Sequence, residues 1–253
     1  AAQQIPKNLT QEVGLTDEQG VLRTCQQRLV FPITDHARRT VGFGARQLGD
    51  AFGPKYLNTQ ETPLFHKSVL LYGLDQARDA IRKDRHAILV EGYLDVLACH
   101  RSGVRCAVAA LGTHFSEQHG SRLRQWAEQV TLLLDGDAAG QAACRKVAPV
   151  LWQSDLQVYL GLLPPGEDPD SVVKKSGASA LLKVTKDAAP AMERFIEDAF
   201  REATSIEERA RAARSLQPML RCLRGLERDL YLAKVAERVG LPGRSILGSS
   251  PRG

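Results

Sequence analysis

The 253-residue sequence predicts an α/β fold, in which a parallel-sheet domain lies between a mixed α+β N-terminal subdomain and a C-terminal helical subdomain. Two observations predict it: short apolar runs alternate with helical patterns in the middle third, and helical patterns alone fill the last third. Hydrophobic residues make up 43% and charged residues 25%, which excludes a disordered or collagen-like chain. We expect the three parts at residues 1–82, 83–175 and 176–253.

The first third indicates a β-hairpin followed by a long irregular stretch. Apolar runs at 29–33 and 41–45 flank a turn-like segment at 35–38. Residues 49–73 show no regular pattern, and long loops inside a domain are often functional. Apolar spacing from Leu74 then predicts a short helix.

The middle third is regular. Four apolar runs alternate with three helical patterns, which predicts a parallel sheet with helices on both faces. The runs span 87–90, 107–110, 130–134 and 156–160, and the helices 94–100, 117–128 and 138–152.

The last third is helical. Apolar residues from Met192 to Phe200 form a stripe along one helix face, and Ser205 with Glu208 forms a capping box for the next helix. A third helix is expected to end at Gly240, and residues 248–253 are expected to be a flexible tail.

The composition excludes several classes of protein. No stretch approaches the roughly 18 apolar residues of a membrane helix, and five scattered cysteines without a C-x-x-C pair argue against zinc and a disulfide framework. The chain begins at Ala1 without a signal region, so we expect an excised or processed piece of a cytoplasmic protein. The net charge of +5 suggests an anionic partner.

Acidic residues follow the first, third and fourth predicted strands, as Glu91, then Asp135 and Asp137, then Asp168 and Asp170. Parallel strands end at the same edge of a sheet, so these carboxylates should converge there. Asp-Gly-Asp alone is a common turn and Asp-Pro-Asp can begin a helix, but three such motifs together favour a site for Mg²⁺ or Mn²⁺. Such a site serves phosphoryl or nucleotidyl transfer.

Basic and aromatic residues gather in the irregular stretch of the first third. Arg46, Lys55 and Lys67 offer charges to phosphates, and Tyr56 and Asn58 offer stacking and hydrogen bonding. Taken alone, this pattern also fits a solvated loop face. Beside an acidic metal site, it favours binding of nucleic acid or nucleotide.

The same residues resemble known motifs. The segments EGYLDV at 91–96, DGD at 135–137 and GEDPD at 166–170 resemble the motifs of the TOPRIM domain, which primases, topoisomerases and some nucleases share. Further segments resemble, in order and spacing, the basic motifs of the DnaG-type primase family: FPI at 31–33, GFGAR at 42–46, PKYLN at 54–58, ETP at 61–63, FHK at 65–67 and LYGL at 71–74.

This resemblance implies an RNA polymerase core that makes short RNA primers from NTPs on single-stranded DNA in the cytoplasm, at the replication fork, with a divalent metal. It implies that Glu91 is the catalytic glutamate and acts as general base or metal ligand. It also implies that Asp135, Asp137, Asp168 and Asp170 bind metal, and that Arg46, Lys55 and Lys67 bind template or nucleotide phosphates. Ser68 and Ala138 depart from the family, which usually has Gly and Arg at these positions.

The resemblance also implies missing parts. We expect the zinc-binding domain, part of the N-terminal subdomain and the domain that binds the replicative helicase to lie outside this chain. Two other functions stay open: a TOPRIM nuclease or topoisomerase, and a non-catalytic module that binds single-stranded DNA.

Overall fold

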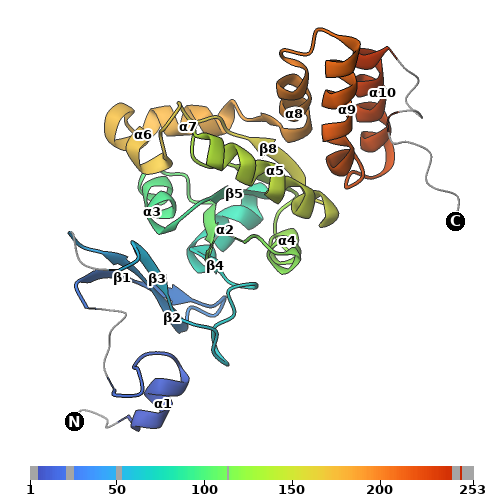
Figure 1. The fold of residues 1–253 in the computed structure, drawn as a ribbon. Coiled ribbons are helices and arrows are strands. Elements are labelled where there is room, and N and C mark those ends of the chain that lie inside the picture. The colour runs from blue at the N-terminus through green and yellow to red at the C-terminus, as the bar shows by residue number, and fades with distance from the viewer. Residues whose placement is uncertain (1–4, 21–25, 50–52, 113, 241–245, 247–253) are drawn as a thin grey trace, which may run out of the picture.

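The computed structural model describes residues 5–20, 26–49, 53–112, 114–240 and 246. In Figure 1 the three-stranded sheet and the C-terminal helical bundle lie on opposite sides of the six-stranded sheet and its helices. The predicted α/β class, with a parallel sheet between a mixed N-terminal part and a helical C-terminal part, is confirmed.

The N-terminal part contains α1 (Lys7–Glu12) and an antiparallel sheet of β1 (Arg28–Thr34), β2 (Thr40–Gln47) and β3 (Tyr56–Asn58). The predicted hairpin is confirmed as β1 and β2. Asp35 closes its turn, because its Oδ1 accepts the N–H groups of Ala37 and Arg39 at 2.8 and 3.0 Å.

The larger sheet has the strand order β4-β6-β5-β7-β8-β9. Its four central strands are parallel, as the alternating pattern predicted. Two-residue strands, too short for any sequence periodicity, add antiparallel edges. The bounds are β4 Leu71–Tyr72, β5 His86–Val90, β6 Ala107–Ala110, β7 Gln129–Leu132, β8 Gln157–Leu160 and β9 Ala189–Pro190.

Helices cover both faces of this sheet. Along β5, Leu89 belongs to one hydrophobic core while Ile88 and Val90 belong to another, because neighbouring strand residues point to opposite faces. The helices are α2 (Leu74–Asp84), α3 (Tyr93–Arg101), α4 (Glu117–Arg124), α5 (Ala138–Gln153), α6 (Pro169–Ser176) and α7 (Ala178–Lys186).

Three helices, α8 (Ala191–Phe200), α9 (Ile206–Leu220) and α10 (Gly225–Val239), form the C-terminal bundle. The capping box of α9 is present, and Gly240 follows α10 with φ +76°. Phe195 of α8 meets Trp152 of α5 edge-on, so the bundle shares a core with one face of the sheet. The predicted tail at 248–253 lies outside the described residues.

Strand and helix contacts cross the predicted boundaries. β4 precedes residue 83 and α2 runs across it, and both pack into the larger sheet, while β9 follows residue 175. The division at residues 82 and 175 stays a prediction. Within the described ranges, none of the helices is long and apolar enough to cross a membrane.

Candidate active site

The acidic segments that follow β5, β7 and β8 lie at one edge of the larger sheet, as parallel strands require. Beside this edge is a cavity of about 710 Å³. Four of the five predicted acidic residues line it, namely Glu91, Asp135, Asp168 and Asp170. Asp137 does not line it and is exposed.

Asp135 has the least satisfied carboxylate of this group. Its Oδ1 is buried and has no hydrogen-bond partner among the described residues. Its backbone N–H donates to Glu91 Oε1 at 3.1 Å, which brings the two carboxylates together. Burial, reinforced by repulsion from Glu91 and Asp168, raises the pKa of Asp135 to about 6. A buried anion of this kind is stabilised by a cation.

Asp95 is a further cavity carboxylate, which belongs to the EGYLDV segment but is not among the site residues predicted from the sequence. It lies in the first turn of α3, is 8% exposed, and accepts the Gly92 N–H through Oδ2 at 2.9 Å. Burial, with repulsion from Asp135 and Asp168, raises its pKa to about 7. Its place in the EGYLDV segment, directly after the predicted strand at 87–90, was the available signal.

The other aspartates already have partners. Asp137 and Asp168 cap α5 and α6, where their Oδ1 atoms accept the N–H groups of Gly140 and Ser171 at 2.8 and 2.6 Å. Asp170 is paired with Lys174 at 2.5 Å. With the side chains in these positions, the described residues contain no group of three His, Cys, Asp or Glu close enough to hold a metal ion.

The cavity residues nevertheless suit a hard divalent cation. All the acidic donors are carboxylate oxygens, and the unpartnered Asp135 Oδ1 together with the raised pKa values of Asp95 and Asp135 indicates uncompensated negative charge. Glu91 is exposed and can rotate toward such an ion. The residues therefore fit the divalent metal that the sequence analysis expected.

Gly136 permits a close approach of two loops. A Cβ added to it would lie 2.1 Å from the carbonyl oxygen of Pro164. Its N–H donates to Glu167 O at 2.9 Å, which ties the loop after β7 to the loop before α6. This glycine thus brings Asp135 and Asp168 onto one cavity.

The N-terminal sheet supplies a basic rim to the same cavity. Arg46, Lys55, Tyr56 and Asn58, all selected from the sequence, line it. Arg46 and Tyr56 face each other across β2 and β3, and the guanidinium lies 5.6 Å from the ring centre. Lys67, the fifth selected residue, does not line the cavity.

Tyr93, which directly follows Gly92, joins the two sheets, a role that was not predicted from the sequence. Its ring stacks on Phe31 at 5.0 Å and meets Tyr72 edge-on at 4.6 Å. Its hydroxyl donates to Asn58 Oδ1. A Cβ on Gly44 would lie 2.4 Å from the Tyr93 ring, so this glycine makes room for the contact.

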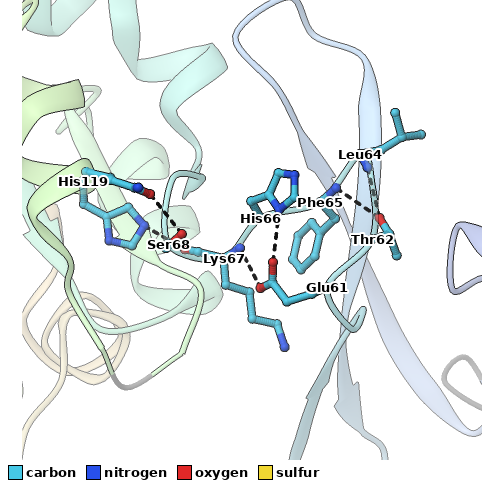
Figure 2. A network of polar contacts seen from close by, with 9 residues as sticks. Glu61, Thr62, Leu64, Phe65, His66, Lys67, Ser68 and His119 are labelled. Atoms are coloured by element: carbon cyan, nitrogen blue, oxygen red, sulfur yellow. Dashed lines mark hydrogen bonds and ion pairs between the residues drawn. The ribbon is translucent and has the colours of Figure 1, made fainter.

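Lys67 belongs to the segment 61–70, shown in Figure 2. Glu61 accepts the Lys67 N–H at 3.0 Å and contacts His66 Nδ1 at 3.3 Å. Glu61 thus contacts both His66 and Lys67 within this segment.

Three family models match the chain. The N-terminal domain of the DNA primase catalytic core matches residues 1–78, a Toprim-like model matches 88–173, and the DnaB-helicase binding domain of primase matches 202–242.

Curated relatives are DNA primases. That of Pseudomonas aeruginosa is 41% identical over 228 residues, which cover 87% of this chain and 34% of the relative. That of Halalkalibacterium halodurans is 37% identical, with 85% and 37% covered. The chain thus spans little more than a third of the length of these relatives.

The chain covers a larger share of several solved structures than of the curated relatives. A DNA primase domain from Pseudomonas aeruginosa superposes with a TM-score of 0.86 at 36% identity, covering 96% of this chain and 79% of that one. The RNA polymerase domain of Mycobacterium tuberculosis primase DnaG gives 0.81 at 33%, with 92% and 78% covered. A DnaG primase catalytic domain bound to single-stranded DNA gives 0.82 at 31%, with 94% and 78% covered.

One expectation is corrected by these matches. We expected the helicase-binding domain to lie outside this chain, whereas residues 202–242, which include α9 and α10, match a helicase-binding model. Amphipathic spacing identifies the buried face of a helix and carries no information about a partner for its exposed face. The family matches along the sequence and the superpositions agree, and the chain belongs to the family of bacterial DnaG-type DNA primases.

Proposed function

We propose that this chain is the RNA polymerase core of a DNA primase, which synthesises short RNA primers from NTPs on single-stranded DNA in the cytoplasm, at the replication fork. One observation carries the proposal: a carboxylate-rich sheet edge and a basic, aromatic strand face line the same cavity. Nucleotidyl transfer needs both, since negative phosphates must be bound beside a cation site.

Each cavity residue has a distinct role in this proposal. Asp135 and Glu91 would hold Mg²⁺ or Mn²⁺, with Asp168 and Asp170 nearby and Asp137 in support. When bound, the cation supplies positive charge beside the phosphates. Glu91, exposed at the cavity, would also accept the proton of the attacking hydroxyl.

The basic rim would bind the anionic partners. Arg46 and Lys55 offer charges to template or nucleotide phosphates, while Tyr56 offers a ring on which a base can stack. Asn58 is tied to Tyr93, so its contribution would be to set the position of β3 against the acidic edge. Lys67 would contact the backbone of the template strand outside the cavity.

The match at residues 202–242 supports a further partner, the replicative helicase, bound through α9 and α10. Their exposed apolar side chains are consistent with this, since Leu226 and Leu230 are 74% and 61% exposed.

Nucleotide incorporation on single-stranded DNA tests the proposal. Asp135→Ala should abolish metal-dependent primer synthesis, whereas Asp79→Ala, at a side chain that is 80% exposed, should leave it unchanged. Equal synthesis by Asp135→Ala and the unaltered protein would refute the mechanism.

The two alternative functions have their own outcomes. Relaxation or cutting of DNA with Mg²⁺ and without NTPs would favour a topoisomerase or nuclease. Binding of single-stranded DNA that survives chelation, without any incorporation, would favour a binding module.

A further inference from the structure

The segment 61–70 connects the N-terminal sheet to β4 and α4. At its start, Thr62 and Phe65 exchange backbone hydrogen bonds of 3.1 and 3.2 Å, and Thr62 Oγ1 accepts the Phe65 N–H at 3.0 Å. The Phe65 side chain is fully buried in the N-terminal core. This end of the segment is therefore anchored to the smaller sheet.

His119, in the first turn of α4, holds the other end (Figure 2). It is fully buried. Its Nε2 lies 2.8 Å from Lys67 O and 3.1 Å from Leu70 O. Carbonyl oxygens only accept, so Nε2 carries a hydrogen shared between them.

The hydrogen-bond partner of the second ring nitrogen, Nδ1, shows that this nitrogen is an acceptor. The backbone N–H of Ser116 donates to His119 Nδ1 at 3.1 Å, so Nδ1 carries no hydrogen. The ring is thus neutral and in a single tautomer. Burial lowers the pKa of His119, in agreement with this assignment.

Neighbouring contacts fasten the same stretch of chain. Ser116 Oγ donates to Ser68 O, and Ser68 Oγ donates to Gln118 Oε1 at 3.0 Å. The His119 ring also packs 5.2 Å from Phe115, which lines the cavity. One side chain therefore connects the backbone of Lys67 with the cavity wall.

The Lys67 side chain is available for a ligand. Its backbone is bound on both sides, by Glu61 through its N–H and by His119 through its carbonyl. Its ammonium group forms no ion pair among the described parts of the chain. A cation that is held on a fixed backbone, and whose ammonium group is not paired within the described ranges, suits a phosphate.

We propose that His119 is a positioning residue, which fixes residues 67–70 on α4 and thereby holds Lys67 where it binds a phosphate of the single-stranded template. This inference rests on the proposed function, in which Lys67 contacts the template. His119 itself touches no substrate and acts through Lys67.

A double-mutant cycle on template binding tests this. Binding of a labelled single strand is measured by fluorescence anisotropy against KCl concentration for Lys67→Gln, His119→Asn and the double variant. Asn cannot reach the two carbonyls, whereas in the control His119→Gln the longer amide keeps a donor near Nε2. Loss of one phosphate contact lowers the salt slope by about 0.7, which corresponds to about fivefold weaker binding at 0.1 M salt.

We expect Lys67→Gln and His119→Asn each to show this loss, the double variant to lose no more than Lys67→Gln, and His119→Gln to retain most of the affinity. The KM for NTPs should not change. Circular dichroism establishes that each variant is folded. If His119→Asn is not, Ser116→Ala replaces it, with the same slope loss expected. This change removes both the donor to Ser68 O and the oxygen that accepts the His119 N–H at the start of α4.

The outcomes separate the two proposals. If Lys67→Gln binds template with unaltered affinity and slope, the assignment of Lys67 in the proposed function is wrong and the inference falls with it. If Lys67→Gln weakens binding while folded His119→Asn does not, or if the two losses add, the role of His119 is refuted and the proposed function stands. A changed KM for NTPs with unchanged template affinity also overturns the inference.

Discussion

Asp95→Asn should stabilise the metal-free protein at alkaline pH. Asp95 is buried beside Asp135 and Asp168, and its pKa is raised to about 7 from an ordinary value of 3.8. The asparagine keeps an oxygen for the Gly92 N–H and removes the charge. A folded-state pKa above the unfolded one means that the contribution of Asp95 to stability is complete below about pH 4. It is lost as the pH rises through the folded value of about 7.

The size of the effect follows from the pKa difference. A rise of the pKa from 3.8 to about 7 corresponds to about 4 kcal/mol between the two protonation states, reached above pH 7. At pH 5 the unfolded chain is mostly ionised while the folded group is protonated, so roughly 2 kcal/mol has already been lost. The advantage of Asp95→Asn should therefore grow by roughly 2–3 kcal/mol between pH 5 and pH 8.

Urea unfolding in EDTA at pH 5, 6.5 and 8 measures this difference. Asp79→Asn, at an exposed aspartate, is the matched control and should show no change with pH. Addition of Mg²⁺ should shrink the advantage, because a cation offsets the same charge. A pH-independent difference between Asp95→Asn and the unaltered protein would refute the electrostatic account of the cavity.

Two other changes test local packing and capping. Gly136→Ala would place a Cβ 2.1 Å from Pro164 O; we expect a loss of about 1–3 kcal/mol in urea unfolding and weaker primer synthesis, and stability like that of Gly92→Ala would contradict this. Ser205→Ala removes the oxygen that accepts the Glu208 N–H at 3.1 Å. It should cost about 1 kcal/mol in thermal unfolding, and a loss no larger than that of exposed Ser179→Ala would count against the cap.

The fold was predictable where long segments repeat a pattern. The apolar run ending at Val90 and the stripe through Phe195 each fix one element, because a buried strand and an amphipathic helix need those spacings. The edge strand at Leu71–Tyr72 was not predictable, because two residues carry no period. Its place follows from pairing with β6, a contact far away in sequence.

The sequence predicted which charged residues gather at the site, but not which partners their side chains contact. Parallel strand ends brought Glu91, Asp135 and Asp168 to one cavity, as the sheet topology required. The roles of Asp137 as a helix cap and of Asp170 as a partner of Lys174 depend on side-chain positions that residue types alone do not give. Asp95 was overlooked because its burial, rather than its position in the motif, gives it an unusual pKa.

The contact between the two sheets explains why one cavity contains both charges. Tyr93 lies only two residues after Glu91 of the acidic edge and packs on Phe31 of the N-terminal sheet. Its neighbours in this contact are aromatic or neutral, so the contact is stabilised by burial and does not depend on the charges in the cavity. Had the sheets been joined by ion pairs between Arg46 and the cavity carboxylates, a divalent cation would compete with that contact. Because this contact is apolar, the carboxylates and Arg46 remain available for the cation and the phosphate of the proposed function.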